Sequence, residues 1–459
     1  MRFTNCKLYL LSCLVCFFAH VPLVHSQNNN NNIYTRFGLG SLEMQANPQQ
    51  FGMGGTGVAS TGQHGVNFLN PAALSYIPLT TLQASGGGMS VKYKYKDTEA
   101  KYGNGYLKNV AFGFRKPGSK WGFALGMQPY SFVNYEASSD VVVSDTLNTT
   151  YTYSGNGGMN KATLGFGRKF FFGGDSTARK EKHVVSFGLN THYLFGTIDH
   201  ASKISFPDQD NYNYGKFSQN HFLNGFQLEA GVLFTLPIVH VKDVNNKVVR
   251  RSDLQIGITY AVQSSLHAKS VYIDEILSAN STIDYPIDTT FMNESVRFNY
   301  DLPQQITAGL AWNIYNQKLG NLQLNLEFMT QDWSSSKLNL GSDATSSNQL
   351  SASNRLSAGI AYTPENSANT STLRHCTYRA GYYQGQTYWK IDGQQVHEQA
   401  ITAGISIPIL KSLNAINLGA AYYTLGESNS GLLEMSGVVY QVGFTFVPRE
   451  PWFFQRKYD

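Results

Sequence analysis

Residues 226–236 decide the fold, and they read Phe226-Gln227-Leu228-Glu229-Ala230-Gly231-Val232-Leu233-Phe234-Thr235-Leu236. Every second side chain from Phe226 to Leu236 is apolar, whereas the positions between them begin with Gln227, Glu229 and Gly231. Successive side chains of a β-strand point to opposite faces, so this period of two predicts a strand with one apolar face. On a helix the same apolar residues would be spread around the whole circumference.

The same alternation recurs along the chain after residue 79. Apolar residues take alternate positions in 254–262, 306–312, 322–328, 356–362, 401–407, 416–422 and 438–446. With the remaining segments of this type, the pattern predicts about fourteen strands, several of them long enough to cross a bilayer at a tilt. Short links at 117–120, 314–320 and 409–411 alternate with long polar links at 138–159, 201–220, 270–294, 332–351 and 385–396. A soluble β-sandwich is the alternative, and the length and number of the strands disfavour it.

Strands that face lipid cannot leave a sheet edge open, because no water is present to satisfy the backbone groups there. We therefore predict an all-β fold, a transmembrane antiparallel β-barrel of about 14 strands formed by residues 79–447. A barrel of this size has an interior that its own side chains do not fill. Residues 27–78, a flexible N-terminus followed by a Gly-rich stretch, are available to fill it as a lumenal hatch.

The first 26 residues predict export. Arg2 and Lys7 precede an apolar run at residues 8–24, and Val24-His25-Ser26 supplies a cleavage site, the layout of a signal peptide. An N-terminal membrane anchor is the alternative. A cleaved signal, short turns on one side and an even strand count together predict a multi-pass barrel of the outer membrane with both termini in the periplasm. Residues 448–459 would then form a periplasmic tail that includes Trp452-Phe453-Phe454.

Composition excludes several classes of protein. Charged residues make up 14% of the chain, against about 25% in a typical soluble domain. The net charge of +5 falls to about +3 without the signal, which argues against a nucleic-acid partner. Cys376 is the only cysteine outside the signal, so the mature chain has no internal disulfide. No metal-binding spacing, cofactor motif or Gly-x-Ser-x-Gly elbow is present, and we predict neither a metal site, nor a cofactor, nor catalysis.

The predicted hatch contains two motifs. Gly52, Gly54, Gly55 and Gly57 permit positive φ angles and close backbone approach, which a chain folded inside a narrow lumen needs. In Asn70-Pro71-Ala72, the proline restricts Asn70 to extended conformations, and the Asn70 side chain can bond nearby backbone groups. We interpret this second motif as a structural pin at the turn into the wall, with direct contact to a ligand as the alternative.

These motifs carry a resemblance to a known family. Phe51-Gly52-Met53-Gly54-Gly55-Thr56-Gly57-Val58-Ala59, Asn67-Phe68-Leu69-Asn70-Pro71-Ala72-Ala73-Leu74 and Asp301-Leu302-Pro303 resemble segments of the FadL/TodX family. Its members are outer-membrane transporters of long-chain fatty acids and other hydrophobic compounds, with fourteen strands. The resemblance implies passive diffusion of a hydrophobic small molecule past the hatch and lateral exit through the barrel wall into the membrane lipids.

Pro129 interrupts the alternation of the third predicted strand, just before Tyr130. Proline cannot donate to a strand ladder, so a bulge or break is expected here. In FadL-type proteins an inward kink of the third strand opens the wall sideways, and the resemblance implies that Pro129 and Tyr130 form this lateral opening. The alternative is that Pro129 only marks the border of the membrane.

Charged residues on the polar faces should point into the lumen, where each needs a partner or water. We expect them to pair with one another or with the hatch, and Arg355 or Arg379 to be possible contacts for a ligand carboxylate. The predicted set is Arg115, His192, Glu229, Glu327, Arg355 and Arg379.

Two further functions fit the same sequence. The FadL-like group also contains barrels, known in Bacteroidota, that act as subunits of outer-membrane secretion or assembly complexes instead of as pores. Such a non-transporting subunit would bind other outer-membrane proteins through its loops or tail, with the hatch as a permanent plug. A structural or adhesive surface protein acting through its long loops is a third possibility.

Overall fold

The computed structural model describes residues 32–448 except 62–64, 96–97, 145–146, 174–182, 207–211, 244–246, 279–284, 337–349, 365–371, 392, 410–412 and 428–432. The predicted signal peptide and nearly all of the predicted tail lie outside the described residues. No helix in the described part is long and apolar enough to span a membrane.

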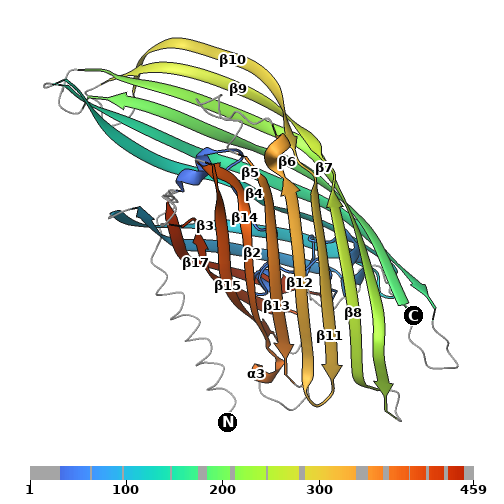
Figure 1. Cartoon of the computed structure of the whole chain (residues 1–459). Helices are drawn as coiled ribbons and strands as arrows, with labels where there is room; N and C mark the ends of the chain where they lie inside the picture. Colours follow the sequence, from blue (N-terminus) through green and yellow to red (C-terminus); the bar gives the residue numbers. More distant parts are fainter. Residues whose placement is uncertain are drawn as a thin grey trace, which may run out of the picture.

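Among the described residues, sixteen strands form a closed antiparallel wall, in which β17 pairs with β2 (Figure 1). β8 and β9 both pair with β7, one after the other along its length. On their other side, β8 pairs with β11 and β9 pairs with β10. β8 and β9 thus form one interrupted wall strand, and β10 and β11 form another. The sixteen strands therefore make a wall of fourteen, and the predicted barrel is confirmed. The strands are β2 (Thr81–Tyr95), β3 (Thr98–Phe114), β4 (Trp121–Ser144), β5 (Leu147–Phe172), β6 (His183–Ser205), β7 (Tyr214–Lys242), β8 (Val248–Ala261), β9 (Ser264–Leu277), β10 (Pro286–Leu302), β11 (Gln305–Asn316), β12 (Gly320–Asp332), β13 (Ala352–Thr363), β14 (Thr377–Ile391), β15 (Gln394–Pro408), β16 (Ala415–Leu425) and β17 (Glu434–Phe446).

The two faces of the wall differ as the alternation predicts. On β7, Phe226 and Leu228 are 65% and 47% exposed, whereas Gln227 and Glu229 are 6% and 9% exposed. The apolar row points outward, toward the position of lipid, and the polar row points into the lumen. An apolar exterior on a closed cylinder is the surface that a membrane barrel requires.

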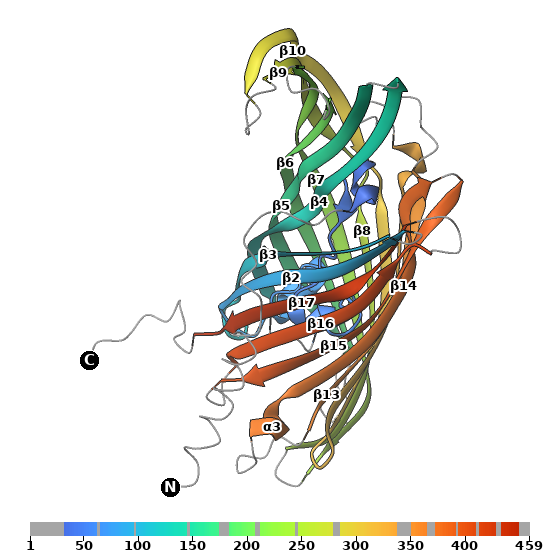
Figure 2. The same ribbon diagram turned by 90° about the vertical axis from the view of Figure 1, so that its left-hand side faces the viewer.

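Four of the predicted long polar links are wrong as loops, because they continue the strands, and one of the four, 385–396, lies mostly in β14 and β15. The hairpins β4–β5, β6–β7 and β9–β10 remain paired through most of 138–159, 201–220 and 270–294. Together they extend one side of the wall into a six-stranded sheet, here named the canopy, which rises beyond the ends of the other strands (Figure 2). Beyond the apolar band, exposed apolar side chains such as Val142 and Phe217 are mixed with polar ones, so the steady alternation disappears from the sequence although the backbone ladder persists.

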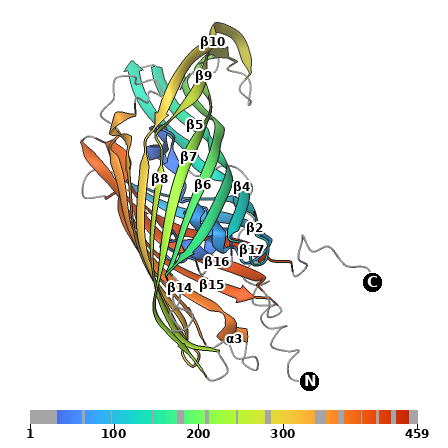
Figure 3. The same ribbon diagram turned by 90° about the vertical axis from the view of Figure 1, so that its right-hand side faces the viewer.

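Residues 32–61 and 65–78 lie inside the barrel and form the described part of the hatch (Figure 3). The hatch contains η1 (Ile33–Arg36), β1 (Ser41–Leu42), α2 (Pro48–Phe51) and η2 (Pro71–Tyr76). α2 packs against β15, β16 and β17, whereas η2 packs against β4 to β7 on the other side of the lumen. Two further short elements, η3 (Trp333–Ser335) and α3 (Thr372–His375), lie in the connections after β12 and β13.

Candidate functional site

Asn70 fastens the hatch at the start of η2. Its backbone is extended, with φ −142° and ψ 113°, as a residue before proline should be. Its side-chain oxygen accepts the N–H of Ala72 at 2.9 Å, while its amide nitrogen donates to the carbonyls of Val58 at 2.7 Å and of Val232 in β7 at 3.2 Å. Asn70 therefore caps η2, joins two parts of the hatch and ties both to the wall.

Glu327 of β12 holds the glycine loop of the hatch. One of its carboxylate oxygens accepts the N–H groups of Gly57 and Val58 at 2.8 and 2.9 Å. The residue is buried, so these two bonds replace the water that the charge would otherwise need. The predicted lumenal carboxylate thus lies against the predicted glycine loop.

The four predicted hatch glycines serve two different needs. Gly54 and Gly55 have φ angles of +69° and +80°, which only glycine adopts without strain. Gly52 and Gly57 do not have positive φ angles, so the expectation of positive φ is wrong for these two residues. Gly52 is needed for close approach, because a Cβ atom on it would lie 2.9 Å from the Cα of Gly404 in β15.

A row of wall glycines contacts η2, and the sequence alone did not predict this row. The row consists of one residue from each of four neighbouring strands, in register across the sheet: Gly122, Gly167, Gly188 and Gly231. A Cβ atom at Gly188 would lie 2.2 Å from the carbonyl carbon of Pro71, and one at Gly231 would lie 2.2 Å from the side-chain oxygen of Asn70. The backbone of η2 therefore rests directly on the backbone of the wall. The only signal in the sequence is that these glycines fall on the polar face of their strands.

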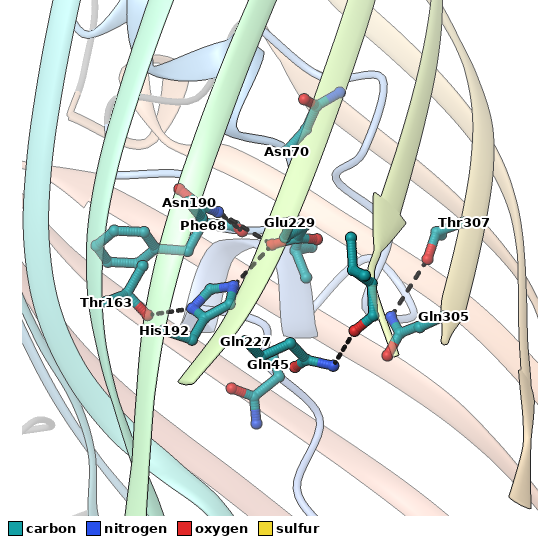
Figure 4. Close-up of polar contacts among 12 residues, drawn as sticks. Gln45, Phe68, Asn70, Thr163, Asn190, His192, Gln227, Glu229, Gln305 and Thr307 are labelled. Carbon is teal, nitrogen blue, oxygen red and sulfur yellow. Dashed lines mark hydrogen bonds and ion pairs between the residues drawn. The ribbon is translucent and has the colours of Figure 1, made fainter. Parts of the chain in front are cut away.

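His192 and Glu229 form a buried network beside η2 (Figure 4). Thr163 bonds one ring nitrogen of His192 at 2.8 Å, and the other ring nitrogen lies 3.0 Å from Glu229. Asn190 donates to Glu229 at 3.0 Å and to the hatch carbonyl of Phe68 at 3.2 Å. The order hydroxyl, imidazole, carboxylate resembles that of a catalytic triad. However, all members are buried in the contact between hatch and wall, and we interpret the network as structural.

The other predicted lumenal charges have separate roles. Arg115 donates to the carbonyls of Ile77 and Pro78 at the end of the hatch, at 2.5 and 3.5 Å. Arg379 donates to the hydroxyl of Ser406 on the next strand at 2.6 Å. Arg355 lies over the ring of Tyr383, 5.9 Å from its centroid. No group of three or more metal-ligating side chains occurs in the described ranges.

An aromatic cluster that includes Tyr34 of η1 fills the lumen on the side of the canopy, and we name it the upper core. Trp333 of η3 stacks on Tyr388 at 4.8 Å between ring centroids, and Tyr34 stacks on Trp389 at 5.8 Å. All four side chains are almost fully buried. The hydroxyl of Tyr34 donates to the carbonyl of Leu433 at 2.6 Å, and burial raises the pKa of Tyr34 to about 12. The hydroxyl thus stays a neutral donor at physiological pH.

The β3–β4 seam is the shortest ladder between neighbouring strands of the wall in the described part of the chain. Only five residues of each strand pair, Val110–Phe114 with Phe123–Met127. Two residues further on, the β4–β5 register shifts between Pro129 and Ser131, which leaves Tyr130 as an extra residue with a buried side chain. The shift reverses which side chains face inward, so β4 turns away from β3 at this point. We name the gap beyond Met127 the slot.

The first part of the hatch, residues 32–45, lies in the slot and is here named the strap. Its β1 pairs with β4 at Ser41–Phe132 and Leu42–Ser131. The N–H of Glu43 donates to the carbonyl of Tyr130 at 2.9 Å, and its carboxylate pairs with Lys108 of β3. The strap therefore bonds β4 on one side and β3 on the other.

A cavity of about 300 Å³ lies behind the slot. Its lining mixes apolar and aromatic side chains with polar ones and includes the charged residues Glu43, Arg355 and Glu398. The rings of Tyr106 in β3 and Phe132 in β4 meet at 5.1 Å between centroids, across the gap that separates the two strands. Both rings belong to the lining of the cavity.

Comparison with known proteins identifies the family. The model of the BamG family matches residues 7–459. The chain belongs to the BamG family. No curated protein matches it.

Solved structures similar to this BamG-family chain include the toluene transporter TodX of P. putida, with 14% identity, 89% of this chain and all of that chain covered, and a TM-score of 0.52. The toluene transporter TbuX of Ralstonia pickettii has 12% identity, covers 88% of this chain and 98% of its own, and has a TM-score of 0.50. A Pseudomonas aeruginosa FadL homologue has 13% identity, coverages of 87% and 98%, and a TM-score of 0.47. At these identities the similarity to TodX and TbuX establishes the barrel fold alone.

Proposed function

We propose that this protein is a non-transporting barrel subunit of a protein complex in the bacterial outer membrane, with a role in assembly. The observation that supports this proposal best is that the lumen is filled at two levels. The hatch beyond the strap occupies the middle of the barrel, and the upper core, to which Tyr34 and Leu39 of the strap belong, lies between that part and the canopy. Membership of the BamG family favours the assembly function among those that the sequence left open.

The contacts between the hatch and the wall favour a permanent plug. Glu327 of the wall accepts bonds from the hatch backbone, the wall glycines contact the hatch backbone directly, and Asn70 of the hatch donates to the wall backbone at Val232. Backbone groups cannot move aside by changing a rotamer. The polar bonds are buried, so each bond that opens leaves a donor or acceptor without water. A passage for solute would require many of these bonds to break together.

We expect the wild-type protein, extracted from native membranes in mild detergent, to copurify with other outer-membrane proteins at a fixed stoichiometry. Reconstituted alone in liposomes, it should admit toluene no faster than liposomes without protein. Quantitative mass spectrometry of the purified complex and a toluene-uptake assay measure the two properties. A solitary barrel that accelerates toluene uptake would contradict the subunit function.

Passive transport of a hydrophobic small molecule is the second candidate, and the cavity behind the slot favours it. A ligand in this cavity could leave toward the membrane lipids between Tyr106 and Phe132, beside Pro129 and Tyr130. The TodX and TbuX transporters share the barrel fold, which is compatible with this function. Neither an energy source nor a cofactor would be required.

A double substitution separates the two candidates. If the protein transports, Tyr106→Ala with Phe132→Ala should raise toluene uptake several-fold, because both rings that meet across the slot are removed. If it is a plugged subunit, uptake should stay at the level of empty liposomes in both proteins. Leu107→Ala, which removes an exposed side chain next to Tyr106, is the matched control.

A further inference from the structure

A positively charged side chain lies on the outer surface of the wall, near the end that is opposite the canopy. Arg168 of β5 pairs in the ladder with Trp121 of β4 and with Phe187 of β6. The residue before it, Gly167, contacts η2 in the lumen, so the period of two turns Arg168 outward. Trp121 and Phe187 share this outer face and are 41% and 51% exposed. Arg168 therefore lies on the surface that meets lipid.

Two aromatic rings hold the guanidinium of Arg168. Its central carbon, Cζ, lies 4.2 Å from the ring centroid of Trp121 and 4.7 Å from that of Phe170. Neighbouring rings support both partners, because Trp121 contacts Phe166 at 5.0 Å and Phe170 contacts Phe187 at 6.0 Å between ring centroids. Such rings orient the plane of the guanidinium, but they carry no negative charge to balance it.

Among the described residues, the side chains around Arg168 supply no carboxylate. Its two ladder partners, and the residues two before and two after it in β5, are all aromatic. Residues 100–135, 147–173 and 183–198, which form this part of β3 to β6, contain no aspartate or glutamate. Nε of Arg168 is buried and has no hydrogen-bond partner within the described part of the chain. A charge removed from water needs an opposite charge, so this arrangement leaves a place for an anion.

Further basic residues surround this end of the wall. Lys120 and Lys169 lie one step beyond the pair that Arg168 forms with β4, and the N–H of Lys169 donates to the carbonyl of Lys120 at 3.0 Å. Arg115 and Lys116 follow directly after β3 on the neighbouring strand. Positive charge gathered in this way attracts anions and raises their local concentration.

The position of these groups selects a phospholipid among anions. From Arg168 toward the middle of the wall, the outer face continues with apolar side chains such as Phe123, Leu125 and Leu164, which are 38%, 51% and 63% exposed. An anion at Arg168 would have hydrocarbon on this side and water at the end of the barrel on the other. A phospholipid keeps its phosphate at such a boundary, and arginine binds phosphate oxygens through two parallel N–H bonds.

We propose that Arg168, Trp121 and Phe170 form a binding site for the phosphate group of a membrane phospholipid, with Lys120 as a second positive charge beside it. The guanidinium donates two N–H bonds to the phosphate oxygens, and the two rings hold its plane. The acyl chains lie along the apolar outer face toward the middle of the wall. The site does not depend on the proposed function, because the outer surface of the wall meets lipid in a subunit and in a transporter alike.

Titration of the full-length protein with lipid in mild detergent tests the site. Native mass spectrometry counts the molecules of dimyristoyl phosphatidylglycerol that stay bound. The affinity for the first lipid should fall at least tenfold in Arg168→Gln, because the charge and both parallel bonds are lost. Arg168→Lys keeps the charge without the planar fork, so its affinity should lie between those of the wild type and Arg168→Gln.

Lys116→Gln is the matched control, because it removes an equal charge from an exposed side chain at the same end of the barrel. It should weaken binding less than twofold. Equal losses in Lys116→Gln and Arg168→Gln would overturn the proposal, since the lipid would then respond to net charge alone.

Two further probes on the wild-type protein need no substitution to fold. Dimyristoylglycerol, which lacks the phosphate, should bind at least tenfold more weakly than phosphatidylglycerol. Inorganic phosphate at millimolar concentration should leave the bound lipid in place. Equal binding of dimyristoylglycerol, or displacement of the lipid by inorganic phosphate, would overturn the proposal.

The acidic residues nearest to Arg168 in the sequence are Asp175 and Glu181, which lie outside the described residues. The double variant Asp175→Asn with Glu181→Gln therefore tests whether the chain itself supplies the anion. Its affinity for phosphatidylglycerol should stay within twofold of the wild-type value. Should the lipid bind to this double variant and not to the wild type, Arg168 is paired within its own chain and the proposal is wrong.

Discussion

Gly188→Val is expected to displace the hatch from its contact with the barrel wall. The new Cβ atom would lie 2.2 Å from the carbonyl carbon of Pro71 and 2.4 Å from the backbone nitrogen of Ala72. Both clashing atoms belong to the backbone of η2, so no change of rotamer relieves the overlap. We expect a loss of ~3 kcal/mol or more in the free energy of unfolding, at the upper end of the range for overpacked sites.

Limited proteolysis of the hatch and the temperature at which the barrel loses its compact migration in gels measure this effect. Cleavage within residues 32–78 should become fast in Gly188→Val and stay slow in the wild type. Gly105→Val is the matched control, because a Cβ atom at Gly105 in β3 meets only the carbonyl oxygen of Gly87, at 3.8 Å. Equal protection of the hatch in both variants would contradict the direct backbone contact.

Glu327→Ala is expected to release the glycine loop of the hatch. Without the carboxylate, the N–H groups of Gly57 and Val58 remain buried with no acceptor. Each orphaned donor costs about 1–3 kcal/mol, so the total loss should be about 2–6 kcal/mol. Glu327→Gln keeps an oxygen in the same position and should lose less than half of that amount.

Hydrogen exchange at the amides of Gly57 and Val58 measures this prediction directly. Both amides should exchange at least a hundredfold faster in Glu327→Ala and only slightly faster in Glu327→Gln. Leu326→Ala removes the outward-facing neighbour, which is 49% exposed, and should leave both amides protected. The assigned role of Glu327 is refuted if these amides exchange at the wild-type rate in Glu327→Ala.

The sequence predicts the wall well because the wall obeys one local rule. In residues 226–236 each side chain must meet either lipid or the lumen, and that choice is visible residue by residue. The same rule fails in the canopy, where 138–159 and 201–220 read as loops. These segments carry no steady alternation of apolar and polar residues, so their pairing depends on neighbouring strands and not on their own composition.

Within the site, the sequence predicts residue types but not their partners. Glu327 is expected in the lumen because it lies on a polar face, yet only the closed barrel brings it against Gly57, 270 positions away. Pro129 predicts a break in its strand, whereas the short seam with β3 and the strap that fills the slot involve three separate segments of chain. Contacts over such separations leave no periodic signal in a single sequence.

The sequence by itself thus determines that alternate side chains meet hydrocarbon, that the strands must close, and that a glycine-rich segment precedes them. Only the tertiary structure decides that four wall glycines form one contact surface for η2, because their alignment depends on the register of four strands. These glycines are Gly122, Gly167, Gly188 and Gly231. Burial against lipid is a property of single residues, whereas register and close packing are properties of pairs.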